Sequence, residues 1–162
     1  ADRRPPSVLN RLKPIVRRTV TWSGLVTRPV TLGVRGFVVD GQRRIFLVRH
    51  GYLPGWYLPG GGVDPGESAG RALVRELEEE GGLRVEESRI FGLYLNSRTS
   101  RRDHVALFVV EAFTMSPSPF VPNAEIREVG FFPLDALPEE TTGATRRRIA
   151  EVVEGAPRAD IW

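Results

Sequence analysis

The chain has 162 residues, 41% of them hydrophobic and 27% charged, which is the balance of an ordinary soluble domain rather than of a disordered or membrane protein. It has no cysteine and only two histidines, His50 and His104. These counts exclude a disulfide framework, a thiolate nucleophile and a cysteine-ligated metal. Any bound metal is therefore expected to rely on oxygen ligands, which favours hard cations such as Mg²⁺ or Mn²⁺.

The net charge of +3 is unevenly distributed along the chain. The first 30 residues hold seven basic residues and one acidic residue, Asp2, so the rest of the chain is net negative. We predict a basic N-terminal arm over residues 1–28 and one folded domain over residues 29–162. A solvated run of charge is the commoner explanation of such an arm, so nucleic-acid binding is not predicted. The arm is a candidate contact with a second copy in a homodimer.

Apolar runs are too short to cross a bilayer, and no hydrophobic stretch of the kind found in signal peptides follows the N-terminal arginines. We therefore expect a cytoplasmic protein without a membrane partner.

The first half of the chain is predicted to contain two strands and two helices. In order, we expect a weak helix over residues 8–20, an extended run over 29–39, a hairpin turn at Asp40-Gly41, a strand over 44–49, a glycine-rich stretch over 51–66 and a helix over 68–80. Glycines at 81 and 82 are expected to end that helix.

The second half is predicted to be richer in strands. We expect β-rich runs over 90–98 and 104–114, a charged turn over 101–103, a Pro/Ser loop over 116–122, a strand over 126–132 and a helix over 145–154. Because a helix interrupts the strands in mid-chain, the fold class is α/β, a mixed sheet with helices packed on it.

The helix over 68–80 places an acidic residue inside its apolar stripe. At 100° per residue, Leu73 and Leu77 define the stripe, Glu80 falls within it, Glu76 lies at its edge and Glu79 is adjacent. An unpaired charge near a core costs several kcal/mol unless something compensates it, and a divalent cation is the simplest compensation. The alternative is a solvated acidic face, but that alternative does not account for the position of Glu80.

The glycines before the helix fit the same interpretation. Gly60, Gly61 and Gly62 permit backbone conformations that are closed to other residues and allow the main chain to approach a ligand or metal closely.

Residues 61–83 resemble the signature of the Nudix hydrolases, G-x5-E-x7-R-E-U-x-E-E-x-G-U, in which U is a bulky aliphatic residue. Every fixed position is filled, by Gly61, Glu67, Arg75, Glu76, Leu77, Glu79, Glu80, Gly82 and Leu83. The resemblance implies the Nudix-type α/β/α sandwich with a mixed β-sheet. It also implies Mg²⁺- or Mn²⁺-dependent hydrolysis of a nucleoside diphosphate linked to another moiety, or of a nucleoside triphosphate, by attack of water on phosphorus.

The resemblance also implies roles for individual residues. The implied metal ligands are the carboxylates of Glu76, Glu79 and Glu80 and the backbone carbonyl of Gly61. Arg75 would orient Glu76 through an ion pair, and Glu67 would support the site from behind.

The resemblance leaves the general base open. It is either a glutamate of the signature or a loop residue such as Glu125 or Glu128, for which ordinary loop charge is the alternative interpretation.

Substrate contacts are expected just before the signature. Tyr52, Trp56 and Tyr57 are candidate base-stacking rings, with Trp56 the strongest, although packing in a core is the commoner role of such rings. Arg49 is a candidate phosphate or sugar contact, as are His50 and the arginines at 98, 101 and 102, with surface solvation the alternative. No marker residue identifies the substrate beyond a nucleotide-derived small molecule.

A catalytically silent Nudix-like module that senses a nucleotide is the alternative function. The intact glutamate set favours the hydrolase.

Overall fold

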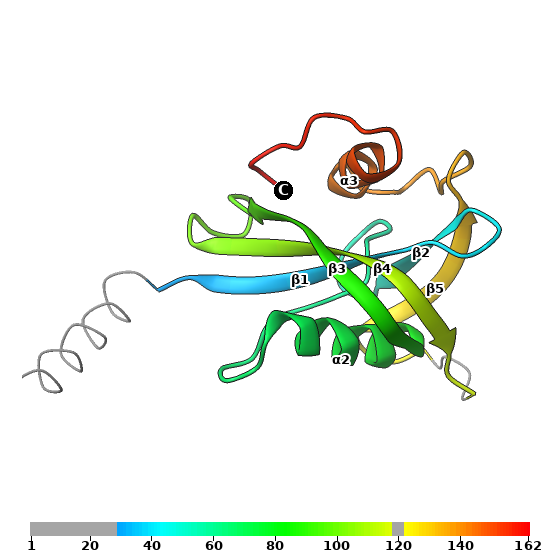
Figure 1. The fold of residues 1–162 in the computed structure, drawn as a ribbon, viewed down its shortest axis with the longest axis horizontal. Helices are drawn as coiled ribbons and strands as arrows, with labels where there is room; N and C mark the ends of the chain where they lie inside the picture. The colour runs from blue at the N-terminus through cyan, green and yellow to red at the C-terminus, as the bar shows by residue number, and fades with distance from the viewer. Residues whose placement is uncertain (1–28, 118–121) are drawn as a thin grey trace, which may run out of the picture. The chain divides into compact units, whose positions relative to one another are not determined.

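The computed structural model describes residues 29–117 and 122–162 (Figure 1). Residues 31–162 form one compact unit, and all the elements discussed below belong to it. The predicted helix over 8–20 and the predicted basic arm lie outside the described residues, and the boundary at residue 28 stays a prediction.

Five strands and two helices make up the described part of the chain. In order, they are β1 (Thr31–Val38), β2 (Arg44–His50), α2 (Ala69–Gly81), β3 (Leu83–Leu95), β4 (Asp103–Met115), β5 (Ile126–Pro133) and α3 (Gly143–Val153).

The strands form two sheets between the two helices. One sheet has the order β1-β4-β3, with β1 parallel to β4 and β3 antiparallel to β4, while β2 and β5 form an antiparallel pair. Helix α2 lies on one side of the strands and α3 on the other (Figure 1). This arrangement confirms the predicted α/β/α sandwich with a mixed sheet.

The predicted hairpin at Asp40-Gly41 is a tight turn, but its two strands do not pair along their length. The Asp40 carboxylate accepts the backbone N–H of Arg44 at 2.9 Å, and a single antiparallel bridge joins Val39 to Ile45. Strand β1 then pairs with β4 on one edge and with the loop over residues 59–63 on the other. Because both edges of β1 are occupied, β2 pairs with β5 instead.

Strand β3 begins and ends earlier than the predicted run over 90–98. It starts at Leu83, directly after the residue that ends α2. Irregular pairing at Val85 and Glu87 interrupts the alternation of apolar and polar residues by which a strand is recognised in a sequence. Residues 96–98 belong to the turn before β4. The bounds of β4, β5 and α3 agree with the predicted elements to within two residues.

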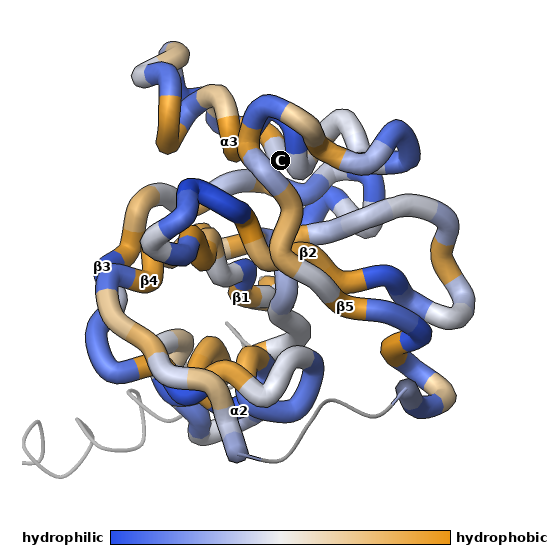
Figure 2. The backbone as a smooth tube through the Cα atoms, turned by 90° about the vertical axis from the view of Figure 1, so that its right-hand side faces the viewer, coloured by the Kyte–Doolittle hydropathy of each residue, from blue (hydrophilic) through white to orange (hydrophobic). Residues whose placement is uncertain are grey.

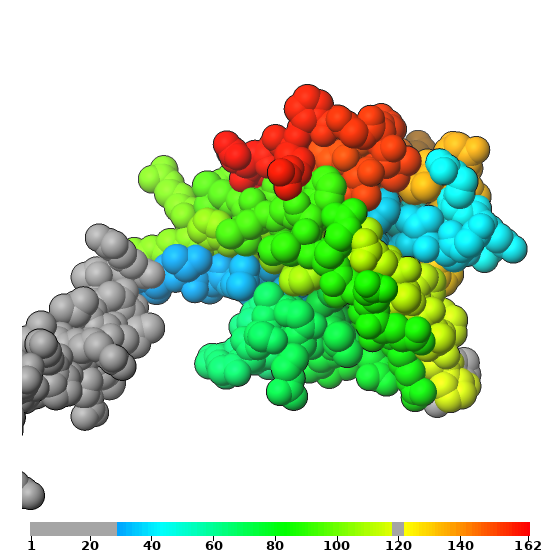
Figure 3. All heavy atoms as spheres, viewed as in Figure 1, coloured from blue at the N-terminus to red at the C-terminus, as the bar shows by residue number. Residues whose placement is uncertain are grey.

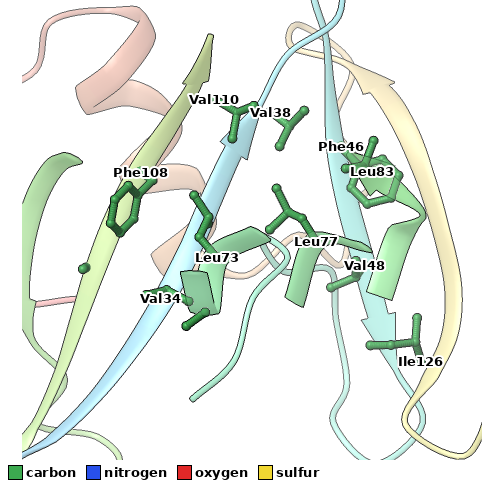
Figure 4. Packing of buried hydrophobic residues seen from close by; sticks show 12 residues of the cluster. Val34, Val38, Phe46, Val48, Leu73, Leu77, Leu83, Phe108, Val110 and Ile126 are labelled. Atoms are coloured by element: carbon green, nitrogen blue, oxygen red, sulfur yellow. The ribbon is translucent and has the colours of Figure 1, made fainter. Parts of the chain in front are cut away.

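A hydrophobic core holds α2 in place. Leu73 and Leu77 are fully buried and lie among Val34 and Val38 of β1 and Val48 of β2 (Figure 4). Burying each leucine contributes roughly 2 kcal/mol to stability. The apolar stripe predicted for this helix is therefore confirmed.

A second core lies on the side of α3, where Phe37 and Leu47 pack with Ile149. Strand β2 contributes to both cores, and its hydropathy is high along most of its length (Figure 2). The C-terminal residues cover the same side (Figure 3), and the N–H of Trp162 donates to the carbonyl of Leu95 at 3.0 Å.

Among the residues that the structure describes, no helix is long and apolar enough to cross a membrane.

Candidate metal and catalytic site

Helix α2 has defined ends that fix the position of its glutamates. The Ser68 hydroxyl accepts the N–H of Arg71 at 3.3 Å at the start of the helix. At the other end Gly82 adopts a left-handed conformation, with φ of 63°, and donates its N–H to the carbonyl of Glu78. Three carboxylates of the signature, those of Glu76, Glu79 and Glu80, occupy the last two turns between these caps.

Glu80 is a buried carboxylate, only 5% exposed. Its Oε2 accepts the backbone N–H of Gly60 at 2.6 Å. Burial raises the pKa of the Glu80 carboxyl to about 7, although the positive charge of Arg35 and the bond from Gly60 act in the opposite direction. The predicted inward orientation of Glu80 is thus observed, and its partner is the glycine loop.

The glycine loop runs beside β1 at a separation that excludes a side chain at Gly60. Gly60 has φ of +133°, and a Cβ there would lie 2.2 Å from the carbonyl oxygen of Val34. Gly61 packs against Glu76, since a Cβ on Gly61 would lie 2.5 Å from Glu76 Oε1. Both glycines therefore allow the backbone to reach the carboxylates of α2.

The carbonyl of Gly61, which the resemblance names as a metal ligand, already accepts the N–H of Val34 at 2.8 Å. A carbonyl oxygen has two lone pairs, so this hydrogen bond leaves one acceptor position on Gly61.

Arg75 connects the loop to the helix through several hydrogen bonds. Its Nε and Nη2 donate to the two oxygens of Glu67 at 3.1 and 2.9 Å, and its Nη1 donates to Glu76 Oε1 at 2.7 Å. Nη2 also donates to the carbonyl of Gly62 at 3.0 Å. The hydrogen bonds from Arg75 lower the pKa of the Glu67 carboxyl. These contacts are the ones that the expected orienting role of Arg75 and supporting role of Glu67 require.

Glu76 has a mostly buried side chain that is close to other acidic groups. Burial raises the pKa of its carboxyl, the ion pair with Arg75 opposes this, and the negative charges of Glu79 and Glu125 raise the pKa further. Glu79 is 62% exposed and lies 3.5 Å from Arg75. The three carboxylates thus differ in solvation, from buried Glu80 to exposed Glu79.

A hard divalent cation fits the chemistry of this donor set. Oε2 of Glu76 and Oε1 of Glu80 have no hydrogen bond from the part of the chain that the structure describes, so each retains an oxygen for a ligand. Within residues 29–117 and 122–162 no three acidic or imidazole side chains already converge as a metal cluster. A cation would therefore draw the carboxylates of Glu76, Glu79 and Glu80 together, and its charge would offset their mutual repulsion.

The structure separates the two loop glutamates proposed as general base. The carbonyl of Glu125 accepts the N–H of Gly51, in the loop after β2, at 2.8 Å. The negative charge of Glu125 raises the pKa of the carboxyls of both Glu76 and Glu80. Glu128 pairs in register with Arg49 and lies 4.0 Å from it.

Glu128, named together with Glu125 as a candidate base, has a different position from Glu125. Its neighbour Val129 packs in the core against α2, so Glu128 faces the opposite side of the β2-β5 pair. Arg49, expected to contact substrate, lies on that same opposite side and binds Glu140 at 2.8 Å. Alternation along β5 therefore directs Glu128 and Arg49 away from the carboxylates of α2.

The candidate stacking rings also differ in position. Trp56 is 5% exposed and packs edge-on against Phe132, with ring centroids 4.7 Å apart, so its indole belongs to the core. Packing, the alternative kept open for this ring, is the role that the structure gives it. Tyr52 is 63% exposed and lies 5.3 Å from the ring of His50. Burial raises the pKa of its phenol, the charge of Glu125 raises it further, and the charge of Arg35 opposes the shift. The residue before it, Gly51, donates its N–H to the carbonyl of Glu125 at 2.8 Å.

Sequence reasoning missed Arg35 and underrated His50. Arg35 donates from Nη1 to the carbonyls of Leu58 and Gly60, so it fixes the loop that binds Glu80. The signal for it is an arginine in the middle of an apolar strand. His50 is buried and its Nδ1 has no hydrogen-bond partner in the described chain, while burial and the charge of Arg35 lower the pKa of its imidazole.

Comparison with known proteins agrees with this geometry. Residues 29–152 match the NUDIX domain family, and the chain therefore belongs to the Nudix family. Residues of the chain are similar to a Bacillus subtilis protein named "Putative 8-oxo-dGTP diphosphatase", with 40% identity over 75 residues that cover 46% of this chain and 50% of that protein. Human diphosphoinositol polyphosphate phosphohydrolase 2 is 32% identical over 101 residues, covering 62% of this chain and 54% of that protein.

The chain spans about half the length of these curated relatives. Among solved structures, a MutT NUDIX hydrolase from Burkholderia pseudomallei superimposes with a TM-score of 0.65 and 30% identity, covering 76% of this chain and 98% of that one. The fold and the family predicted from residues 61–83 are thereby confirmed.

Proposed function

We propose that this protein hydrolyses a pyrophosphate bond in a nucleotide-derived small molecule, either a nucleoside diphosphate linked to another group or a nucleoside triphosphate. The observation that carries the proposal is the buried carboxylate of Glu80, held by the N–H of Gly60 beside Glu76 on a helix with a complete Nudix signature. The names of two relatives refer to 8-oxo-dGTP and to diphosphoinositol polyphosphates, and both kinds of compound contain a phosphoanhydride.

Mg²⁺ or Mn²⁺ held by Glu76, Glu79 and Glu80, with the Gly61 carbonyl as a further ligand, would neutralise charge on the phosphate oxygens and lower the pKa of a bound water. Arg75 keeps Glu76 in place through the 2.7 Å hydrogen bond, and Glu67 holds Arg75 from behind. The N–H of Gly60 holds the carboxylate of Glu80 in its buried position, and Arg35 fixes the loop that carries Gly60.

Glu125 is the loop residue best placed to accept the proton from the attacking water. It is exposed, it directly precedes Ile126, which packs in the core against α2, and its charge acts on both Glu76 and Glu80. Tyr52, exposed beside the same carboxylates, is the aromatic ring available to a nucleobase or another flat group of the substrate.

The experiment is a Mg²⁺-dependent hydrolysis assay over nucleoside triphosphates, 8-oxo-dGTP, ADP-ribose and other nucleoside diphosphate derivatives, with products identified by chromatography. Glu79→Gln and Glu80→Gln should each lower kcat by about a thousandfold or more on the best substrate while the circular dichroism spectrum is retained. Glu78→Gln is the matched control, because Glu78 belongs to the same helix but faces solvent beside Arg84.

Tight nucleotide binding without turnover across the whole panel would contradict the proposal and favour the sensor function instead. Equal activity of wild type and Glu80→Gln would contradict the assignment of the site to α2.

A further inference from the structure

The turn between β3 and β4, residues 96–103, is held by a dense set of hydrogen bonds. Asn96 donates from Nδ2 to the Thr99 hydroxyl at 2.9 Å and to Asp103 Oδ2 at 2.8 Å. The Thr31 hydroxyl donates to the other oxygen of Asp103 at 2.7 Å. Four backbone hydrogen bonds close the turn from within. The turn therefore presents its remaining side chains from a fixed backbone.

Those remaining side chains include three arginines, Arg98, Arg101 and Arg102, and all three are exposed. None forms an ion pair or a side-chain hydrogen bond with the residues at 29–117 and 122–162, whereas other surface arginines such as Arg44 and Arg89 bind Asp40 and Glu111. Three positive charges within five residues repel one another, and the carboxylate of Asp103, the acidic residue of the turn, already accepts hydrogen bonds from Asn96 and Thr31.

The turn lies at the same end of β1 as the glycine loop of the acidic site. Thr31 pairs with Asp103 and donates its N–H to the carbonyl of Arg102 at 3.0 Å. On the other edge of β1, the N–H of Val34 donates to the carbonyl of Gly61. Two residues of β1, Leu32 and Gly33, lie between Thr31 and Val34, so the two points are about 10 Å apart along the strand. In Figure 3 the light-green turn projects from the rest of the unit.

The turn and the glycine loop therefore contact the same end of β1, and a substrate that extends beyond the loop at this end would approach the turn. Arginine is the side chain best suited to phosphate, because its planar guanidinium donates two parallel hydrogen bonds and stays charged. Solvation of the turn accounts for one exposed arginine. It does not account for three arginines without a partner in the described chain, on a hydrogen-bonded backbone at the same end of β1 as the glycine loop.

We propose that Arg98, Arg101 and Arg102 form a subsite for phosphate groups that the substrate carries away from its scissile pyrophosphate. This inference rests on the proposed function and narrows it to polyphosphorylated substrates. Dinucleoside polyphosphates and diphosphoinositol polyphosphates share this chemistry, whereas ADP-ribose and simple nucleoside triphosphates lack a remote phosphate.

The test compares wild type with the triple variant Arg98→Gln/Arg101→Gln/Arg102→Gln. We expect the variant to lose about tenfold or more in kcat/KM, mainly through KM, on one or both of the polyphosphorylated classes. Its kcat/KM on ADP-ribose and dGTP should change less than twofold. The wild-type KM for the polyphosphorylated substrate should also rise with salt more steeply than that of the variant, because exposed charges are screened.

A charge-matched control is Arg43→Gln/Arg84→Gln/Arg89→Gln, which removes three exposed arginines elsewhere. The control should behave as wild type on every substrate. Dinucleoside polyphosphates and diphosphoinositol polyphosphates are assayed separately, and the class whose kcat/KM falls in the turn variant is the one whose phosphate the subsite binds. Equal effects of the turn variant on all substrates, or none on any, would overturn the proposal.

A binding measurement separates this proposal from the catalytic one. Inositol hexakisphosphate, titrated calorimetrically in EDTA, should bind wild type and the control more tightly than the turn variant by about tenfold. If wild type hydrolyses nothing but this difference is found, the proposed function fails and the subsite stands. If the three proteins bind the probe equally, the subsite is refuted.

Discussion

Replacing Glu80 by glutamine should make the metal-free protein more stable at neutral and alkaline pH. The carboxyl of Glu80 has a pKa near 7 in the folded protein because it is buried, against an ordinary value of 4.5 in the unfolded chain. Glutamine is nearly the same size, and its carbonyl oxygen can still accept the N–H of Gly60. The substitution therefore removes the ionisation while keeping the hydrogen bond.

The sign follows from proton binding. Between pH 4.5 and 7 the folded protein holds a proton on Glu80 that the unfolded chain has lost, so the free energy of unfolding decreases as pH rises through this window. Above pH 7 the decrease is complete and amounts to about 3 kcal/mol, at 1.36 kcal/mol per pKa unit. The glutamine variant lacks this decrease, so the two proteins should match near pH 4.5 and differ by about 3 kcal/mol at pH 8.

The assay is urea unfolding in EDTA at pH 5 and pH 8 for wild type, Glu80→Gln and the exposed control Glu78→Gln. Adding Mg²⁺ at pH 8 should raise the free energy of unfolding of wild type and of the control, but not that of Glu80→Gln. Parallel pH profiles of wild type and Glu80→Gln would refute the argument that burial of Glu80 carries an energetic cost.

The remaining predictions concern the loop, the base and the orienting arginine. Gly60→Ala should lower the free energy of unfolding by about 3 kcal/mol or more in urea unfolding, because its Cβ would overlap the chain at a positive φ, while Gly62→Ala, which meets no atom within 4 Å, should change it by less than about 0.5 kcal/mol. Glu125→Gln should lower kcat by about a hundredfold and Glu128→Gln by less than twofold; the reverse order would contradict the assignment of the base. Arg75→Gln should lower kcat about a hundredfold, because Glu76 loses its 2.7 Å partner, and an unchanged pH–rate profile would argue against that role.

Helix α2 was predictable because two independent signals coincide there. The spacing of Leu73 and Leu77 defines the buried face, and Glu80 falls within it for a reason that only function supplies. Local rules also identify the helix ends, since Ser68 and Gly82 act through their own backbone neighbours.

The positions that sequence reasoning left open or missed depend on long-range pairing. Whether Glu125 or Glu128 faces α2 is decided by the register of β5 against β2, which a single sequence does not reveal. Trp56 is buried because α3 and β5 close over it, and both lie far along the chain. Arg35 gains its role only when the loop over 59–63 lies along β1.

The central claim is that carboxylates at the end of α2 hold a divalent cation. Its most direct test is a Mn²⁺ titration followed by electron paramagnetic resonance on wild type, Glu79→Gln, Glu80→Gln and the control Glu78→Gln. We predict that wild type and Glu78→Gln bind Mn²⁺ with equal affinity and that Glu79→Gln and Glu80→Gln bind it at least tenfold more weakly. Unchanged Mn²⁺ affinity in Glu79→Gln and Glu80→Gln would contradict the claim.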